Sequence, residues 1–481
     1  MSKSEVLALC ANGHRFLAPD ALEYILSKDD PVAFINLVLK RVLSDKLFLS
    51  KGDVVDAITG DAKLFTAMKE IKAQPRTISD IRIFKESDIT GESKSEGNFD
   101  DFVKYFSSRF QMIKRIIERR IDFQRAIDIS MAKSYKSLDR EFKIIGMVDE
   151  IARTRNGHTM VNIADMTDNV KVMVLKDSPL RNTSFVKDEV VGFIGKFNRD
   201  FSLFFPSRIV RPDISKSNKW EASDTSSKVA FVSDIHIGSK TFMESGWKRM
   251  ISWLKSNQEK ECINYLVFPG DVVDGIGIYP GQEQELDEQN IYRQYEMLAE
   301  CLKEIPDEIK MVLHPGNHDA CRLAEPQPAL NSIFTKGFDS NIALVGNPVT
   351  FEIEGRVITS YHGKSFDDWI PSIQRLSYDT PIESMKEMCM RRHVAPIYGG
   401  KNAISPENKD YLVMERLPNI FVTGHIHKVG QGIYNGVRLL NASTFQNQTS
   451  FQKQHNFNPT PCVFPTIDLS NGLIRMHNFN I

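Results

Sequence analysis

The chain has 481 residues and a formal net charge of −1, with 41% hydrophobic and 26% charged residues. This composition excludes a globally disordered chain, and the near-zero charge excludes a protein that coats nucleic acid through a generally basic surface. The length suits about three domains of ordinary size.

The first 74 residues predict a small helical domain. Candidate helices follow the N-cap-like Leu17–Asp20, span Pro31–Leu39 and open at Ser50–Asp53. Residues 75–100 are polar and rich in serine, glycine and charge, which is typical of a flexible linker.

Residues 101–140 are expected to contain a long amphipathic helix. Apolar residues recur every three or four positions, at Phe102, Phe106, Phe110, Ile113, Ile117 and Ile121. Basic residues lie elsewhere on the same helix: Lys104, Arg109, Lys114, Arg115, Arg119 and Arg120. These could contact DNA, but such charges more often form a solvated face, and we favour that interpretation.

Residues 141–215 predict a small closed barrel of the OB type. Five short apolar strands occur in about seventy residues, with turns such as Asn156-Gly157 between them. OB folds often bind single strands through aromatic side chains on the barrel face. Here Phe201, Phe204 and Phe205 could equally form the core, so a structural or docking role is favoured.

Residues 228–481 predict a layered α/β domain, because apolar strands alternate with helical stretches. At five places an apolar run ends and polar, metal-type ligands follow at once. Side chains at the carboxyl ends of neighbouring strands converge on one crevice, so we expect one site. The five motifs are Asp234-Ile-His236, Gly270-Asp271-Val-Val-Asp274, Gly316-Asn317-His318-Asp319, His362-Gly363 and Gly424-His425-Ile-His427.

Carboxylate, imidazole and amide ligands together suit Mn²⁺, Fe or Zn²⁺ rather than Ca²⁺. A two-metal site needs one carboxylate that bridges the ions and further ligands on each. Five of the eleven histidines fall within these motifs, which is not a chance distribution, whereas His314 lies inside a strand and is interpreted as packed structure. The predicted ligands are Asp234, His236, Asp271, Asn317, His362, His425 and His427.

The six cysteines are scattered and form no CxxC pair, which indicates free thiols in a reducing compartment rather than a disulfide framework or a structural zinc site. The N-terminus lacks the apolar run of a signal peptide, and no stretch of 18 apolar residues occurs. We therefore expect a soluble, cytoplasmic protein without membrane contact.

In this order the motifs resemble those of the calcineurin-like metallophosphoesterase superfamily, over residues 228 to about 470. The resemblance implies a four-layer α/β/β/α phosphoesterase domain within a multidomain α/β chain. It implies two divalent ions, with Mn²⁺ expected and Mg²⁺ as the alternative. The first ion would take Asp234, His236, Asp271 and His427, and the second would take the bridging Asp271 with Asn317, His362 and His425.

The resemblance also makes His318 the uncoordinated catalytic histidine beside the phosphate. It would donate a proton to the leaving oxygen, and Asp319 would hold its ring as the orienting carboxylate. The alternative for Asp319 is a capping role after the turn at residues 316–318.

Three further stretches resemble the small, exonuclease subunits of archaeal family D DNA polymerases: residues 275–283, 320–329 and 441–452. Phe445 stands where that family's pattern has a tryptophan. The order of helical unit, linker, barrel and phosphoesterase agrees with this family. The resemblance implies a 3′→5′ proofreading exonuclease that acts on the 3′ end of a DNA primer, with a large polymerising subunit as partner.

Two alternatives remain open at this stage. One is a stand-alone DNA repair nuclease or another metallophosphodiesterase, although a small-molecule phosphodiesterase has no need of an OB barrel. The other is a scaffold with a vestigial site, which the complete set of ligands disfavours. The C-terminal HNFNI is either a docking element for a sliding clamp or a frayed end, and the lack of a clamp-binding pattern favours the frayed end.

Overall fold

A computed structural model of the chain describes residues 3–12, 15–28, 31–39, 48–59, 80–135, 140–454 and 456–480. The chain forms two compact units, Met1–Ile78 and Ser79–Ile481. Among the helices in these ranges, none is both long and apolar enough to cross a membrane.

The first unit is built from short helices around a small apolar core. A reciprocal capping box opens the last of them: the Asp53 carboxylate accepts a hydrogen bond from the Ser50 amide (2.9 Å), and the Ser50 hydroxyl accepts one from the Asp53 amide (3.3 Å). Ile25 and Val38 are fully buried in the core. The elements are α1 (Lys3–Asn12), β1 (Phe16–Leu17), α2 (Pro19–Leu26), α3 (Pro31–Leu39), β2 (Phe48–Leu49) and α4 (Lys51–Thr59), with β1 and β2 paired in parallel.

The expected flexible linker is instead part of the second unit over its described residues, 80–100. Strand β3 (Arg82–Ile83) pairs with β13 (Val349–Ile353), and the short 3-10 helix η1 (Lys85–Ser87) follows it. Ser93, Lys94 and Ser95 then bind the Glu407 carboxylate, at 2.7, 3.0 and 3.2 Å. The prediction of a flexible linker is wrong for these residues, because their hydroxyl and amide groups form hydrogen bonds with a carboxylate about three hundred residues further along the chain. Residues 75–79 lie outside the described ranges.

Helix α6 (Phe99–Glu118) is the predicted amphipathic helix, and it is shorter than expected. Asn98 and Asp101 form a capping box at its start. Ile121, counted in the apolar stripe, lies beyond its end and is 90% exposed. The 3-10 helix η2 (Ile121–Phe123) and α7 (Ile129–Ser134) follow.

Arg109 does not belong to a solvated face of α6. Its side chain is fully buried, and its Nε donates to Asp410 Oδ2 at 2.6 Å. Its Nη1 also donates to the carbonyl oxygens of Asp188 and Pro396. Arg109 therefore joins α6 to both the barrel and the C-terminal part of the second unit.

The predicted barrel is present as a closed, five-stranded barrel in the order β4-β5-β6-β8-β7. Phe204 is fully buried and packs edge-on against Phe197, with ring centroids 5.1 Å apart. This burial favours the structural role for the aromatic cluster. The strands are β4 (Phe142–Arg153), β5 (Thr159–Ala164), β6 (Asn169–Val174), β7 (Val190–Phe197) and β8 (Leu203–Val210).

Two six-stranded sheets form the rest of the second unit. The first has the order β12 (Ile342–Leu344), β11 (Lys310–His314), β10 (Ile263–Pro269), β9 (Lys228–Phe231), β18 (Val463–Asp468) and β19 (Ile474–Asn478). The second has the order β16 (Gly430–Tyr434), β17 (Val437–Asn441), β15 (Ile420–Thr423), β14 (Arg356–Ser360), β13 and β3.

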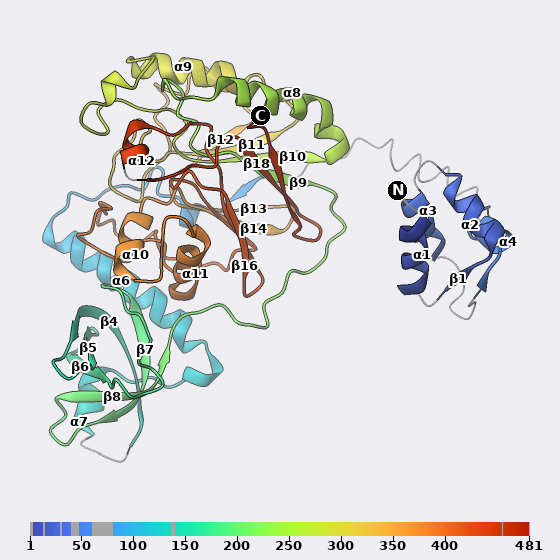
Figure 1. Ribbon diagram of the computed structural model, residues 1–481. Helices are drawn as coiled ribbons and strands as arrows, with labels where there is room; N and C mark the ends of the chain where they lie inside the picture. The colour runs from blue at the N-terminus through green and yellow to red at the C-terminus, as the bar shows by residue number, and fades with distance from the viewer. Residues whose placement is uncertain are drawn as a thin grey trace. The chain divides into compact units, whose positions relative to one another are not determined.

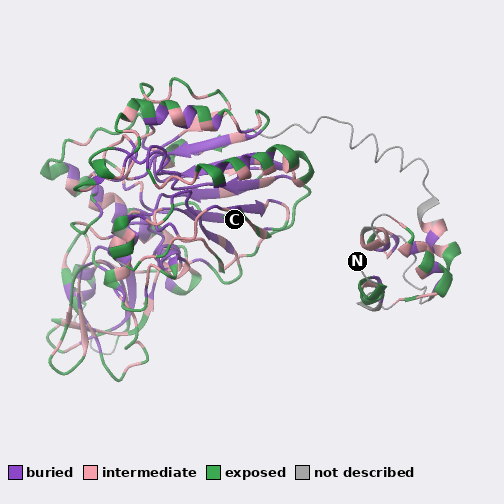
Figure 2. Ribbon diagram, turned by 45° about the horizontal axis from the view of Figure 1, so that its top comes forward, coloured by how far each residue is buried: buried purple, intermediate pink, exposed green. Residues whose placement is uncertain are grey.

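Helices cover the outer face of each sheet (Figure 1). The pair α8 (Glu244–Glu261) and α9 (Ile291–Leu302) lies on the first sheet, and α10 (Phe366–Ser372) and α11 (Pro381–Arg391) lie on the second. Trp247 of α8 and Trp369 of α10 are among the largest fully buried side chains. Figure 2 shows the strands buried while the outer helices carry the exposed residues. The remaining elements are η3 (Gln282–Gln284) and α12 (Ser450–Gln454).

The C-terminal residues are packed rather than frayed. Phe479 is only 8% exposed, its amide donates to Cys462 O at 2.8 Å, and its carbonyl accepts from the Arg249 guanidinium. The favoured expectation of a frayed end is therefore wrong for residues 477–480, because Phe479 contributes to the core of the first sheet.

Candidate metal centre

The five sequence motifs meet where the strands of the two sheets end. β9, β10 and β11 are parallel neighbours in the first sheet, and β14 and β15 are parallel neighbours in the second. In each motif the first candidate ligand lies two or three residues past the end of its strand. The parallel arrangement therefore brings all five strand ends to one place, as the sequence predicted.

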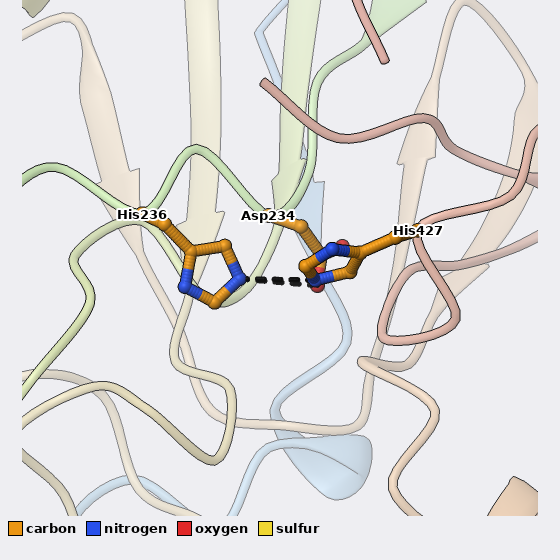
Figure 3. Close-up of side chains that lie close together, drawn as sticks. All are labelled: Asp234, His236 and His427. Atoms are coloured by element: carbon orange, nitrogen blue, oxygen red, sulfur yellow. Dashed lines mark hydrogen bonds and ion pairs between the residues drawn. The ribbon is translucent and has the colours of Figure 1, made fainter. Parts of the chain in front are cut away.

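Asp234, His236 and His427 form the first cluster of candidate ligands (Figure 3). The Nε2 atoms of His236 and His427 lie 3.1 Å apart, and His427 Nε2 lies 3.3 Å from Asp234 Oδ1. All three side chains are buried. Two imidazole nitrogens and a carboxylate oxygen thus face one small volume, which suits a shared cation.

Asp271, His362 and His425 form the second cluster. His362 Nε2 lies 3.2 Å from Asp271 Oδ2 and 3.1 Å from Asn317 Oδ1. Asp271 Oδ2 is also 3.9 Å from His236 Nε2 in the first cluster. Asp271 therefore lies between the two clusters, where a bridging carboxylate would have to be.

Hydrogen bonds at the far side of two rings turn their Nε2 atoms toward the site. His236 Nδ1 is 2.8 Å from Asp274 Oδ1, and His362 Nδ1 donates to Pro269 O at 2.8 Å. Metal-binding histidines in proteins are commonly oriented in this way. Burial also lowers the pKa of His236, which favours the neutral imidazole that a metal requires.

Negative charge is concentrated at the centre of the site. Burial alone would raise the pKa of Asp271, but His362 and its neighbouring imidazoles hold this pKa well below its usual range. Burial lowers the pKa of His362, yet the Asp271 and Asp234 carboxylates outweigh it and raise this pKa to about 10. Ionised carboxylates that are shielded from water favour a cation among them.

His318 lies beside the first cluster, with its ring centroid 4.7 Å from that of His236. Its Nδ1 donates to the Asp274 carbonyl oxygen at 2.8 Å, which leaves Nε2 without a protein partner among the described residues. The backbone amide of His318 donates to Asp271 Oδ1, also at 2.8 Å. The ring is thus fixed next to the candidate ligands.

Asp319 was predicted to be the catalytic carboxylate that orients His318, and this prediction is wrong. Its carboxylate accepts hydrogen bonds from the Gly316 amide (2.8 Å) and the Tyr295 hydroxyl (3.2 Å), and it lies 3.4 Å from the Val272 and Val273 amides. Asp319 therefore caps the turn, which was the alternative role. Burial, with Asp271 nearby, raises its pKa to about 6.

Two further residues shape the site. Asp274 contacts both His236 and His318, and its place in the second motif was a usable signal. Asp367 Oδ2 lies 3.4 Å from His425 Nε2, and the Tyr378 hydroxyl donates to Asp367 Oδ1 at 2.8 Å. Asp367 belongs to no motif, so no local pattern indicated its role.

The remaining histidines lie outside the site or outside the described residues. His314 is buried, its Nε2 is 2.8 Å from the Ser360 hydroxyl, and burial lowers its pKa to about 3, so it is packed structure as predicted. His393 pairs with Asp410 at 2.8 Å. His158 and His477 belong to none of the clusters, whereas His14 and His455 are not among the described residues. All six cysteines are free thiols.

The chain is similar to proteins of known families. The family of the B subunits of DNA polymerases alpha and epsilon matches residues 229–429, a range that contains all five motifs. A protein named DNA polymerase II small subunit from Methanocaldococcus jannaschii is 39% identical over 401 residues, which cover 81% of this chain and 67% of that protein. Its namesake from Archaeoglobus fulgidus is 40% identical and covers 82% of this chain and 79% of that protein.

A solved structure titled as a novel archaeal phosphodiesterase matches 52% of this chain and 98% of its own chain, at 10% identity. Its TM-score is 0.28.

Proposed function

The chain belongs to the family of archaeal DNA polymerase II small subunits, and on this premise we propose that it is a metal-dependent 3′→5′ exonuclease within a heteromeric DNA polymerase. In this proposal it removes nucleotides from the 3′ end of a DNA primer, and a large subunit carries out polymerisation. The family supports a polymerase context, and the site geometry supports the phosphodiester chemistry.

The observation that carries the proposal is the meeting of seven candidate ligands from five strand ends. The donor set fits two divalent cations, since each cluster combines carboxylate and imidazole groups and Asp271 lies between them. We propose that Asp234, His236, Asp271 and His427 hold one ion, and that Asp271, Asn317, His362 and His425 hold the other. Mn²⁺ is the expected ion, with Mg²⁺ as the alternative.

When bound, two divalent ions activate water for attack on phosphorus and neutralise charge on the phosphate oxygens. The chain's own residues then control position and proton transfer. His318 lies beside the first cluster with its Nδ1–H held by the Asp274 carbonyl, so Nε2 is the ring nitrogen left to exchange a proton with the substrate. We propose that His318 Nε2 delivers the proton to the leaving oxygen.

We propose that the five-stranded barrel is of the OB type and acts in docking rather than in catalysis. Its Phe204 is buried and cannot stack with a base. The barrel is held to the C-terminal part by buried contacts: Arg391 Nε lies 2.6 Å from Glu189 Oε2, and the Tyr398 amide donates to Asp188 Oδ2 at 2.9 Å. We further propose that the C-terminal part is a four-layer calcineurin-like domain.

A nuclease assay tests the proposal. The full chain with Mn²⁺ should shorten 3′-mismatched DNA, and His318→Ala should lower kcat by about 10²- to 10⁴-fold while leaving the fold intact. His158→Ala is the matched control, because His158 lies in the turn after β4 and outside the clusters. Unchanged nucleolysis by His318→Ala would remove its catalytic role. Failure to co-purify a large partner would remove the polymerase context alone.

A further inference from the structure

A pocket of about 680 Å³ opens beside His318, outside the two clusters of candidate ligands. One wall is the loop at residues 275–278, and the other is the loop at residues 320–323. Ile291, Asn331, Ile333 and Phe334 also line it. Because His318 itself lines the pocket, a molecule bound in it would touch the residue that faces the reacting phosphate.

The walls carry large apolar side chains that are open to solvent. Ile276 is 44% exposed, Leu323 is 60% exposed and Ile333 is 45% exposed. The polar groups nearby have partners elsewhere: the Asp319 carboxylate binds backbone amides, and Arg322 Nε donates to Pro326 O at 2.9 Å. A mostly apolar pocket with a small number of polar groups is typical of a ligand-binding site.

Buried glutamine side chains fix the first wall. Gln294 Oε1 accepts from the Gly275 amide at 2.9 Å, and Gln294 Nε2 donates to the Gly275 carbonyl at 3.2 Å. Gln282 Oε1 accepts from the Ile278 amide, also at 2.9 Å. Both glutamines are fully buried. The wall is therefore formed before a ligand arrives, so little ordering opposes binding.

A second pocket, of about 620 Å³, continues from the first and shares Ile333 and Phe334 with it. Tyr292, at the start of α9, stacks on Phe334 with ring centroids 5.4 Å apart. Lys303 and Lys336 also line this pocket, and both are exposed. Glu296 and Glu300 line it too, and both carboxylates pair with Arg293 Nη1, at 3.0 and 3.5 Å. An apolar recess followed by an aromatic pair and two exposed lysines matches the alternation of base and phosphate in a single strand.

We propose that the pocket beside His318 binds the unpaired base of the penultimate nucleotide of a DNA strand, and that the second pocket receives the nucleotide before it. This inference rests on the proposed exonuclease function. In 3′→5′ hydrolysis, water adds to phosphorus and the bond from phosphorus to the 3′ oxygen of the penultimate nucleotide breaks. That oxygen takes a proton from the protonated His318 ring, and the attacking water releases a proton to solvent, from which His318 is protonated again. A nucleoside 5′-monophosphate leaves, and the DNA strand keeps a new 3′ hydroxyl.

The assignment of this pocket to the penultimate nucleotide follows from the position of His318. The group that protonates the leaving oxygen must lie next to the nucleotide that carries this oxygen, which is the penultimate one. A base in a duplex is stacked and paired and cannot turn into the pocket. The pocket therefore selects single-stranded or frayed ends over paired ones.

The test uses the full chain with Mn²⁺ and three single strands of equal length. One carries all its bases, one has an abasic tetrahydrofuran residue at the penultimate position, and one has it at the terminal position. For the first cleavage, kcat/KM should be on the order of 10-fold lower on the penultimate-abasic strand, as expected from the loss of one base contact. The terminal-abasic strand should be cleaved like the intact one.

Leu323→Ser and Ile276→Ser should each reduce this discrimination between the intact and the penultimate-abasic strand. Both positions are exposed, so the fold should tolerate the change. Leu473→Ser is the matched control, because Leu473 is 53% exposed and lies in the turn between β18 and β19. The proposed role of the pocket would be overturned, with the exonuclease function left standing, if the wild-type chain cleaved all three strands equally. The same conclusion would follow if Leu323→Ser discriminated between the intact and the penultimate-abasic strand as strongly as wild type. Cleavage of none would overturn the exonuclease function and the pocket with it.

Discussion

Replacing Asp274 by asparagine should weaken metal binding while keeping the backbone hydrogen bond that holds His318. The Asp274 carboxylate is 1% exposed and lies 2.8 Å from His236 Nδ1, so it both orients this ring and raises its basicity. Loss of such a partner typically lowers metal affinity or activity by about 10- to 100-fold, or roughly 1.4 to 2.7 kcal/mol. The hydrogen bond to His318 uses the backbone carbonyl of residue 274, which the substitution leaves in place, whereas the Asp274 carboxylate lies 3.9 Å from His318 Nδ1.

The measurement is exonuclease rate against Mn²⁺ concentration, together with Mn²⁺ affinity by calorimetry. Asp274→Asn should shift the Mn²⁺ dependence to higher concentration and recover most of its rate at saturation, whereas His318→Ala should keep its lowered rate at every Mn²⁺ concentration. Asp379→Asn, whose carboxylate is 72% exposed, is the control and should behave as wild type. An unchanged Mn²⁺ affinity in Asp274→Asn would refute the role of Asp274 as the partner of a metal ligand.

Two further predictions concern stability. Arg109→Met should destabilise the second unit by about 3 kcal/mol in urea unfolding, the lower end for breaking a fully buried pair, because Asp410 keeps His393 as a partner. The exposed control Lys248→Met should have no measurable effect, and equal effects would contradict the burial argument. Burial raises the pKa of Glu325 from 4.5 to about 7. With EDTA present to remove metal ions, the stabilisation from protonated Glu325 should therefore be complete below pH 4.5. The free energy of unfolding should then fall by about 3 kcal/mol as the pH rises through 7. Glu325→Gln should flatten this part of the stability curve between pH 5 and 8, and an unchanged slope would exclude Glu325 as its source.

The strands and the candidate ligands could be predicted from the sequence because both signals are local. Each apolar run forms one strand, and the first ligand of each motif follows it within three residues, as with Asp234 after β9 and Asp271 after β10. Parallel pairing of these strands then brings the ligands together without further information. The same reasoning located the barrel strands, because their turns and alternating burial are also local features.

Two of the errors share one physical cause, which is a partner far away in the sequence. Arg109 was assigned to a solvated face because Asp410 lies 301 residues further along the chain. The polar stretch at residues 93–95 was assigned to a linker because its acceptor is Glu407. Asp319 was assigned to orient His318 on the resemblance of its motif, but its carboxylate turns back to cap its own loop.

The backbone at the site was not predicted, and it explains why these residue types recur there. Asp234, His236, Asp271, His425 and His427, five of the seven candidate ligands, adopt left-handed φ values between 50° and 70°. Such values cost roughly 1 to 2 kcal/mol for a residue with a Cβ atom, although asparagine, aspartate and histidine adopt them more readily than most. The strand-end loops stabilise one another, since the amides of residues 234 and 236 donate to the carbonyls of residues 270 and 271, at 3.1 and 3.2 Å. Aspartate and histidine therefore serve two purposes at these positions: they can bind a metal ion, and they tolerate the left-handed backbone of the turn that follows each strand.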